Sequence, residues 1–253
     1  MIRAPIVDLA PGERTLGGAV GHYLVRVLRM RAGDTFVAFD PATGTEAGAV
    51  VVGTDADSIL VRFGNSRLAT ADLGRKITFV QGLPKGDKCD AVVRDATELG
   101  ATRLIVAVTK RSVVRLDDGR ALARQTRWAR IVEDAARQCG RARPPTVDHP
   151  TTWGEALDSV GTEAARFCLY EGATQALGPP LFEALAGTAD LAFACGPEGG
   201  LETGEVDAAL ARGWIVCSLG PLVLRTETVA AAVLGAVRIW SGLQPSDAGT
   251  APA

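Results

Sequence analysis

The sequence contains few of the residues that build metal and redox sites. It has only two histidines, His22 and His149, and its five cysteines form no Cys-x-x-Cys pair. Protein zinc sites are typically built from such closely spaced cysteines and histidines. We therefore expect no bound metal. We also expect the cysteines to be buried, unreactive thiols, since three of them sit in apolar runs (Cys168, Cys195 and Cys217).

Long apolar segments are absent as well. No run approaches the ~18 apolar residues that a membrane span requires. The start, Met1-Ile2-Arg3-Ala4-Pro5, lacks the apolar stretch typical of a secretion signal. A hydrophobic content of 47% with 22% charged residues is ordinary for a globular protein. We expect a cytoplasmic protein with no membrane partner.

Three widespread catalytic motifs are missing from the sequence. It has no Gly-x-x-x-x-Gly-Lys-Ser/Thr loop, no Gly-x-Gly-x-x-Gly after an early strand, and no Gly-x-Ser-x-Gly elbow. These absences argue against a P-loop kinase or ATPase, a dinucleotide-binding or Rossmann-type methyltransferase fold, and an α/β hydrolase. No fixed-period repeat is present either, which argues against a solenoid.

The net charge of −2 conceals an uneven distribution. Residues 103–143 hold 11 Lys and Arg against 4 Asp and Glu, whereas residues 144–218 hold 2 against 11. Such asymmetry is consistent with one basic surface that binds nucleic acid. It is equally consistent with a solvated arginine-rich helix.

The first 70 residues have the pattern of a small β-barrel. Short strands are expected at 35–39, 46–52 and 58–63, separated by turn formers such as Asp40-Pro41. Residues 68–75 are small and polar enough for a linker. We therefore expect a first domain over residues 1–70.

The rest of the chain alternates between strands and helices. Continuous apolar runs at 77–80, 104–108, 167–169, 191–194 and 215–219 are typical of parallel strands covered on both faces. Helices are expected at 89–99, 119–140 and 226–240. These elements predict an α/β domain over 71–243. The polar tail 244–253 is expected to be disordered.

Three of these strands are followed by glycine-containing loops. The loops are Tyr170-Glu171-Gly172, Gly196-Pro197-Glu198-Gly199-Gly200 and the run that starts at Leu219-Gly220-Pro221. Open α/β sheets bind ligands at the carboxyl ends of their strands, and glycine lets the backbone approach a ligand closely. Each loop alone is also explained as a tight connection between a strand and a helix.

Six segments between residue 22 and about residue 240 resemble, in order, the bacterial 16S ribosomal RNA uracil-N3 methyltransferases of the knotted SPOUT class. The two most discriminating are Leu224-Arg225-Thr226-Glu227-Thr228 and Gln138-Cys139-Gly140-Arg141. The others are 22–29, 85–88, 96–100 and 196–200. The start departs from the family, since Arg3-Ala4-Pro5 replaces a Pro-Arg pair followed by an aromatic residue.

The resemblance implies a PUA-like β-barrel followed by an α/β domain with a trefoil knot. It implies a homodimer in which the last helix, rich in alanine, packs against its partner, although that helix could equally be an ordinary buried one. The implied activity is methylation of N3 of one uridine in the decoding region of 16S ribosomal RNA, in the small ribosomal subunit. The implied cofactor is S-adenosylmethionine, held by Gly196, Pro197, Gly199, Gly200, Leu219, Gly220, Leu224 and Thr226.

Methylation of uracil N3 requires loss of the imide proton. Arg225 is the candidate for stabilising the resulting anion, because a guanidinium can pair with a uracil carbonyl. Glu198 or Glu227 could be the base, proton loss to water is also open, and Glu227 could instead be a helix cap. The candidate RNA contacts are arginines: Arg26, Arg29, Arg31, Arg111 and Arg141, with Arg115, Arg137 and Arg143 as further possibilities.

Two other functions remain open from the sequence. One is a knotted methyltransferase that modifies the ribose 2′-hydroxyl rather than a base. The other is a non-catalytic RNA-binding module of the ribosome that retains the fold. Identification of the methylated nucleoside distinguishes a base-methylating enzyme from a ribose-methylating one. Failure to bind S-adenosylmethionine would favour the non-catalytic module.

Overall fold

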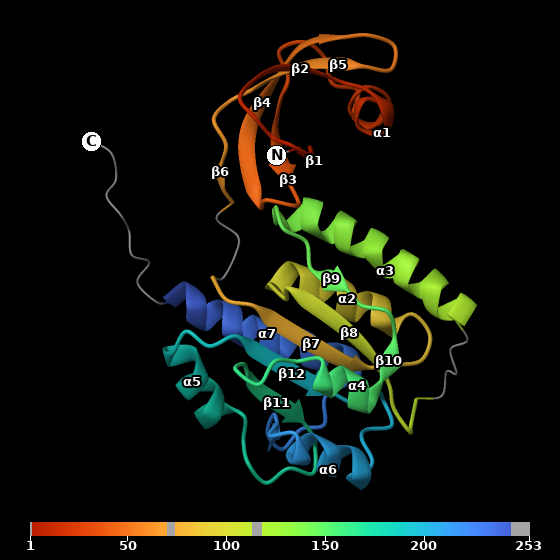
Figure 1. Cartoon of the computed structure of the whole chain (residues 1–253), viewed down its shortest axis with the longest axis vertical. Coiled ribbons are helices and arrows are strands. Elements are labelled where there is room, and N and C mark those ends of the chain that lie inside the picture. The colour runs from red at the N-terminus through yellow and green to blue at the C-terminus, as the bar shows by residue number, and fades with distance from the viewer. Residues whose placement is uncertain (1, 70–73, 113–117, 244–253) are drawn as a thin grey trace. The chain divides into compact units, whose positions relative to one another are not determined.

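The computed structural model describes residues 2–69, 74–112 and 118–243 (Figure 1). The chain divides into two compact units, one formed by residues 1–72 with 134–144 and the other by 73–133 with 145–253. Each unit contains its own β-sheet. The expected domain boundary at residues 70 and 71, the tail 244–253 and Arg115 lie outside the described residues.

The first unit is built on a six-stranded sheet of order β1-β3-β4-β5-β2, with β6 paired to β4. Its three longest expected strands are confirmed. Alternate side chains of these strands, such as Val51, Ile59 and Val61, point into the core. A short α1 and a π-helix, η1, separate β2 from β3. The bounds are β1 Arg3–Pro5, β2 Gly12–Leu16, α1 Gly18–His22, η1 Tyr23–Val27, β3 Thr35–Asp40, β4 Thr45–Thr54, β5 Ile59–Phe63 and β6 Arg67–Leu68.

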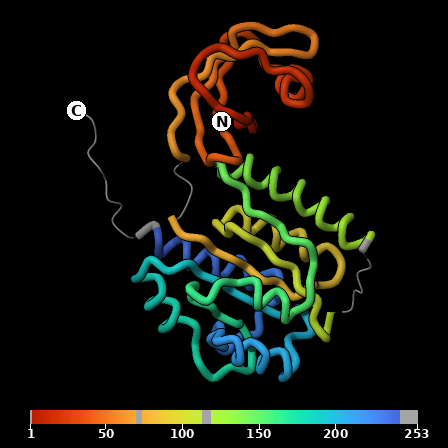
Figure 2. Tube along the Cα trace, in the orientation of Figure 1, coloured from red at the N-terminus to blue at the C-terminus, as the bar shows by residue number. Residues whose placement is uncertain are grey.

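The second unit contains a parallel sheet of order β10-β8-β7-β12-β11-β13, with β9 paired to β8. Figure 2 shows the orange strand β7 beside the blue-green strand β12, and Gln81 of β7 pairs with Cys195, 114 residues later. The bounds are β7 Ile77–Gly82, β8 Arg103–Val108, β9 Thr146–Val147, β10 Thr151–Thr152, β11 Ala165–Leu169, β12 Leu191–Cys195 and β13 Ile215–Cys217.

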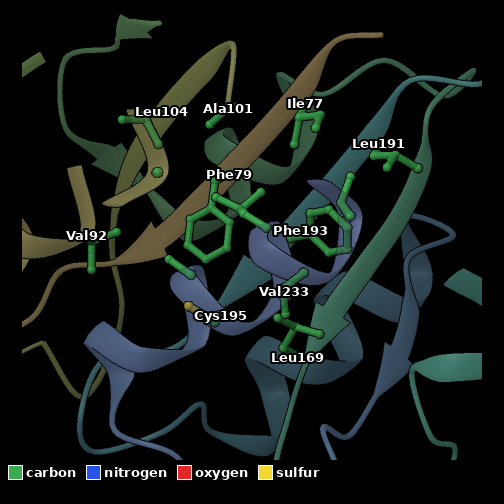
Figure 3. Close-up of a cluster of buried hydrophobic side chains, with 14 of the residues drawn as sticks. Ile77, Phe79, Val92, Ala101, Leu104, Leu169, Leu191, Phe193, Cys195 and Val233 are labelled. Carbon is green, nitrogen blue, oxygen red and sulfur yellow. The ribbon is translucent and has the colours of Figure 1, made fainter. Parts of the chain in front are cut away.

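Helices cover both faces of this sheet. One face, with Phe79 and Phe193, packs against α2 Lys88–Leu99, α3 Asp118–Cys139, α5 Gly178–Ala186 and α7 Thr226–Leu243. The other face, with Val80 and Ala194, packs against α4 Trp153–Asp158 and α6 Thr203–Ala211. Figure 3 shows the first of these cores, with Phe79 and Phe193 labelled. In this core the rings of Phe167 and Phe193 stack with centroids 5.5 Å apart. Burial on both faces explains why the strand sequences are continuously apolar.

Two element ends bear on the site. Helix α3 ends at Cys139, and Gly140 follows it with φ +88°, as expected for a glycine helix stop. The last strand was predicted to reach residue 219, but β13 stops at Cys217. Gly220 has φ +109°, a value that only glycine adopts without strain, so the chain turns here rather than extending.

The cysteines give a direct test of this core. Cys89, Cys168, Cys195 and Cys217 are buried, and Cys139 is half-buried. Burial raises the pKa of the Cys89 and Cys168 thiols to about 12, which suppresses the reactive thiolate at neutral pH. A disulfide reagent at neutral pH is therefore expected to label only Cys139 rapidly, with the other thiols reacting after unfolding in denaturant. Rapid labelling of two or more thiols in the native protein would contradict this packing.

No helix in the described part of the chain is long and apolar enough to cross a membrane. Among the same residues, no three His, Cys, Asp or Glu side chains are grouped so that they could hold a metal ion.

Candidate functional site

The loops after β11, β12 and β13 converge at one edge of the parallel sheet. In the strand register Leu169 lies opposite both Cys195 and Cys217, so the three strands end at the same level. A pocket of about 330 Å³ opens there. Small-ligand sites typically measure roughly 300–1,000 Å³, so the pocket is large enough to bind a nucleoside-sized molecule.

The pocket brings together most of the predicted site residues. Of the predicted cofactor residues it is lined by Gly196, Pro197, Gly200, Leu219, Gly220, Leu224 and Thr226, and of the predicted catalytic residues by Glu198 and Arg225. Gly199 and Glu227 are not part of its lining. The lining also includes Tyr170, Glu171, Leu222 and Val223, which belong to the predicted loops but were given no role of their own. It further includes four residues that were not predicted: Lys88, Leu169, Cys195 and Val229.

Close backbone packing explains two of the loop glycines. A Cβ on Gly200, where φ is +71°, would lie 2.6 Å from Oε1 of Glu171. A Cβ on Gly196 would lie 2.9 Å from the carbonyl carbon of Gly200. By contrast, a Cβ on Gly220, which also lines the pocket, would meet nothing within 4 Å. Gly196 and Gly200 are therefore required by packing within the protein, whereas Gly220 leaves open space beside its backbone.

Glu198 is held by hydrogen bonds at the pocket. Its carboxylate accepts from the backbone N–H of Lys85 at 3.1 and 3.2 Å, and Nζ of Lys88 lies 3.0 Å from Oε1. Burial by itself raises the pKa of Glu198. Hydrogen bonds from its own backbone, from Lys88 and from Lys85 outweigh that effect and keep the pKa below its ordinary value. Glu198 is therefore ionised at neutral pH and a weak proton acceptor.

Glu227 lies in the first turn of α7, on the other side of the same lysine. Its Oε2 is 3.9 Å from Nζ of Lys88. That oxygen is buried and has no hydrogen-bond partner among the described residues. Buried polar atoms are normally paired, so an unpaired Oε2 is unusual, although Glu227 does not line the pocket.

Arg225 differs from Lys88 in having no anionic partner among the described residues. Its side chain is exposed and lines the pocket. Lys88, by contrast, pairs with Glu198 at 3.0 Å and lies 3.9 Å from Glu227. An unpaired guanidinium beside a pocket is free to bind an anion or a carbonyl.

Arg111 contacts the glycine loop. Its Nη1 donates to the carbonyl of Gly199 at 2.7 Å, and its Nε lies 3.9 Å from Glu202. A Cβ on Gly199 would come within 3.1 Å of the Arg111 side chain. Gly199 therefore packs against Arg111 rather than facing the pocket.

The other predicted RNA contacts belong to the first unit. Arg26, Arg29 and Arg31 are exposed, and Arg26 lies 3.4 Å from Asp57. Arg29 has φ +52°, an unusual backbone conformation for a residue with a side chain. Arg141, by contrast, is 3% exposed, so the structure does not present it to an RNA phosphate.

Lys88 offers a test of the electrostatics at this edge. The Lys88→Met variant is expected to raise the pKa of Glu198 toward its ordinary value, and Lys88→Arg to keep it low. Because the folded-state pKa is lowered, the ionised carboxylate stabilises the wild type above the ordinary pKa of 4.5, and this contribution is lost as the pH falls through the lowered value. Titration of the Glu198 carboxyl carbon by NMR measures the shift. An unchanged titration in Lys88→Met would show that the ion pair has no effect.

Comparison with known proteins agrees with this architecture. Residues 72–238 match the family model of an RNA methyltransferase domain, and residues 16–64 match that of an RNA methyltransferase PUA domain. A protein of Bacillus subtilis named ribosomal RNA small subunit methyltransferase E is 30% identical over 245 residues, 95% of each chain. Its namesake from Mycobacterium bovis is 33% identical over 226 residues, 88% of this chain and 84% of the relative.

Solved structures show the same likeness. A ribosomal RNA small subunit methyltransferase E from Neisseria gonorrhoeae, bound to S-adenosylmethionine, superposes with a TM-score of 0.83 at 26% identity, covering 94% of this chain and 97% of that one. A methyltransferase of Legionella pneumophila, also bound to S-adenosylmethionine, gives a TM-score of 0.81 at 25% identity, with the same coverage.

These matches and the glycine-lined pocket define an RNA methyltransferase with a PUA domain at its amino-terminal end. The chain belongs to the ribosomal RNA small subunit methyltransferase E family. The expected α/β fold with a parallel sheet is thereby confirmed, as is the expected class of enzyme, a methyltransferase that uses S-adenosylmethionine.

Proposed function

We propose that this chain transfers a methyl group from S-adenosylmethionine to N3 of one uridine in the decoding region of 16S ribosomal RNA. The shared name of the relatives supports the small ribosomal subunit as substrate. The motif resemblance around Arg225 supports uracil N3. The structural observation that carries the proposal is the unpaired Arg225 guanidinium beside a glycine-lined pocket.

The pocket fits the proposed cofactor. Adenine and ribose need hydrogen-bonding backbone groups at short range, and the pocket is lined by the loop residues Gly196, Gly200 and Gly220, of which Gly220 has open space beside its backbone. Leu219, Leu224 and Val229 supply apolar surface for the adenine ring. When bound, S-adenosylmethionine supplies an electrophilic methyl group on its sulfonium.

Arg225 is the proposed stabiliser of the uracil anion. Loss of the N3 proton places negative charge on the two flanking carbonyl oxygens. A planar guanidinium can donate two hydrogen bonds to such an oxygen, and its attraction grows as the charge develops. Arg225 therefore lowers the free energy of the anion that attacks the methyl group.

The acceptor of the N3 proton is one of three groups. Glu198 already accepts from Lys85 and Lys88, and its lowered pKa makes it a weak base. Oε2 of Glu227 has no hydrogen-bond partner in the described structure, and water is the third candidate. Glu198 lines the pocket but is a weak base, and Glu227 does not line it, so the contacts favour water.

The two domains are proposed to divide the work. The domain over residues 1–70 would bind RNA through Arg26, Arg29 and Arg31, and the domain over 71–243 would catalyse methyl transfer, with Arg111 at the edge of its glycine loop. Arginines contact RNA mainly through phosphates, which makes such binding weaken with salt. A ribosomal substrate places the protein in the cytoplasm.

A homodimer is proposed from an exposed apolar stripe on α7. Ala232, Ala236 and Ile239 are exposed at spacings of four and three residues, so they lie on one face of the helix. Ala230 is buried and Ala231 half-buried, so they belong to the chain's own packing. Sedimentation equilibrium of the wild type and of Ala236→Glu tests whether this face holds two copies together.

The trefoil knot also stays a proposal. After β13 at the edge of the sheet, the chain turns back, and α7 packs against α2, which follows β7. The hydroxyl of Thr226, the first residue of α7, donates to the carbonyl of Gly196, which directly follows β12. This return across the sheet is the support for the knotted path.

Methyl transfer to small subunits that lack their own modification tests the function. We expect labelled methyl from S-adenosylmethionine to enter 16S ribosomal RNA, and mass spectrometry of the nucleosides to identify N3-methyluridine. A product methylated on the ribose would show that the target is the 2′-hydroxyl and not N3 of uracil. No incorporation by protein that binds S-adenosylmethionine would overturn the 16S assignment.

A further inference from the structure

A buried amide stands next to the pocket without lining it. Gln81, near the carboxyl end of β7, is 2% exposed, and its neighbours Phe79 and Val80 are fully buried and apolar. A polar side chain in such a strand is costly unless its hydrogen bonds are made. The partners of Gln81 therefore indicate why it is there.

The Gln81 amide bonds to two segments that line the pocket. Its Nε2 donates to the hydroxyl of Thr226 at 2.8 Å, to the carbonyl of Gly82 at 2.8 Å, and to the carbonyl of Gly196 at 3.3 Å. Its Oε1 accepts from the Cys195 thiol at 3.3 Å. One side chain thus bonds to the end of β12, the start of the glycine loop and the start of α7.

The hydroxyl of Thr226 closes this network. It accepts from Gln81 and donates its only hydrogen to the carbonyl of Gly196 at 2.9 Å. The hydroxyl therefore has no hydrogen left for a ligand. If Thr226 contacts the cofactor, it does so through its backbone or its methyl group.

The segments joined by this network are packed directly against one another. A Cβ on Gly82 would lie 2.7 Å from both N and Cδ of Pro197, so β7 and the glycine loop are in direct contact. Thr226 is itself 4% exposed. The spacing between Gly196 and Thr226 is therefore set by side-chain hydrogen bonds inside the protein.

We propose that Gln81 is a positioning residue that fixes the glycine loop and the start of α7 at the separation S-adenosylmethionine requires. This inference rests on the proposed location of the cofactor pocket. Arg225 directly precedes Thr226, so the same hydrogen bonds also hold the backbone that carries the candidate catalytic arginine.

The test compares Gln81→Met, which keeps the shape and removes both hydrogen-bonding groups, with Thr97→Val. Thr97 is a fully buried polar residue of α2, and its hydroxyl donates to the carbonyl of Val93, outside the pocket lining. Both variants are expected to lower the unfolding midpoint. Only Gln81→Met is expected to raise the calorimetric Kd for S-adenosylmethionine, by about tenfold. A Kd within a factor of two of wild type in folded Gln81→Met overturns the proposal.

A double-mutant cycle with Thr226→Val provides a second measurement. If the amide and the hydroxyl act as one network, adding Thr226→Val to Gln81→Met weakens cofactor binding much less than it does in the wild type. Additive losses overturn the proposal. If Gln81→Met does not fold, Thr226→Val alone decides, since an unchanged Kd in that variant shows that the hydroxyl link is not needed.

The outcome also separates this inference from the pocket assignment. If Gly220→Val abolishes cofactor binding and Gln81→Met leaves it unchanged, the pocket stands and the role of Gln81 falls. If neither variant affects binding by a protein that does bind S-adenosylmethionine, the pocket itself is misplaced.

Discussion

Replacement of Arg225 by alanine is expected to lower kcat/KM for methyl transfer by about 10²–10³-fold, the usual cost of removing one preorganised donor to a developing anion. Arg225 lines the pocket, and its guanidinium has no anionic partner among the described residues. Its loss should therefore affect the transition state while leaving the cofactor pocket intact. Single-turnover transfer of labelled methyl to small subunits measures the effect.

The matched control also removes one positive charge, but at a site away from the pocket. Arg94, exposed on α2 and paired with its neighbour Asp95, is replaced by alanine in the control. Arg94→Ala should retain wild-type turnover, and both variants should bind S-adenosylmethionine as tightly as the wild type. Equal losses in the two variants would mean that only general RNA attraction had been removed. Wild-type turnover in Arg225→Ala would exclude the proposed role.

Gly220→Val is the second large-effect prediction. Gly220 lies at the pocket with φ +109°, and a Cβ there would project into open space. Valine side-chain atoms would occupy volume that the cofactor needs, so we expect the Kd for S-adenosylmethionine to rise at least about a hundredfold. Isothermal titration calorimetry measures it, and methyl transfer should fall with it.

The control variant Gly12→Val distinguishes the effect of backbone strain from the effect of filling the pocket. Gly12, in the first unit, has φ +118° and likewise nothing within 4 Å of an added Cβ. The two variants should therefore cost similar folding free energy through the same unfavourable φ. Only Gly220→Val should lose the cofactor. If Gly12→Val and Gly220→Val both lost cofactor binding, destabilisation of the fold would explain the loss.

The sequence predicted the long strands and helices because each carries a clear periodic signal. The strands of the parallel sheet are apolar throughout, since helices bury both faces, and α3 ends at the glycine that was expected to stop it. Helices α4 and α5 were not predicted. They have only six to nine residues, too few for a helical pattern to stand out.

The pocket loops could be predicted from the glycines that follow each strand, but the interactions between loops could not. Lys88 reaches Glu198 across more than a hundred residues of chain, and Gln81 looks like an interruption in an apolar run. The burial of Arg141 was equally invisible, because a motif shows which residues recur and not which way they face.

The pairing of β7 with β12 has a consequence for the order of biosynthesis. Gln81 leaves the ribosome 114 residues before its partner Cys195, and Thr226, which it also contacts, follows later still. Translation adds about 5–20 residues per second, so β7 can pair early with β8 but waits roughly 6–23 seconds for β12, its other neighbour. The strands of the first unit, which end at Leu68, need no such delay. During its own translation the enzyme should gain an ordered amino-terminal domain first, and the ability to bind its methyl donor only when the chain is nearly complete.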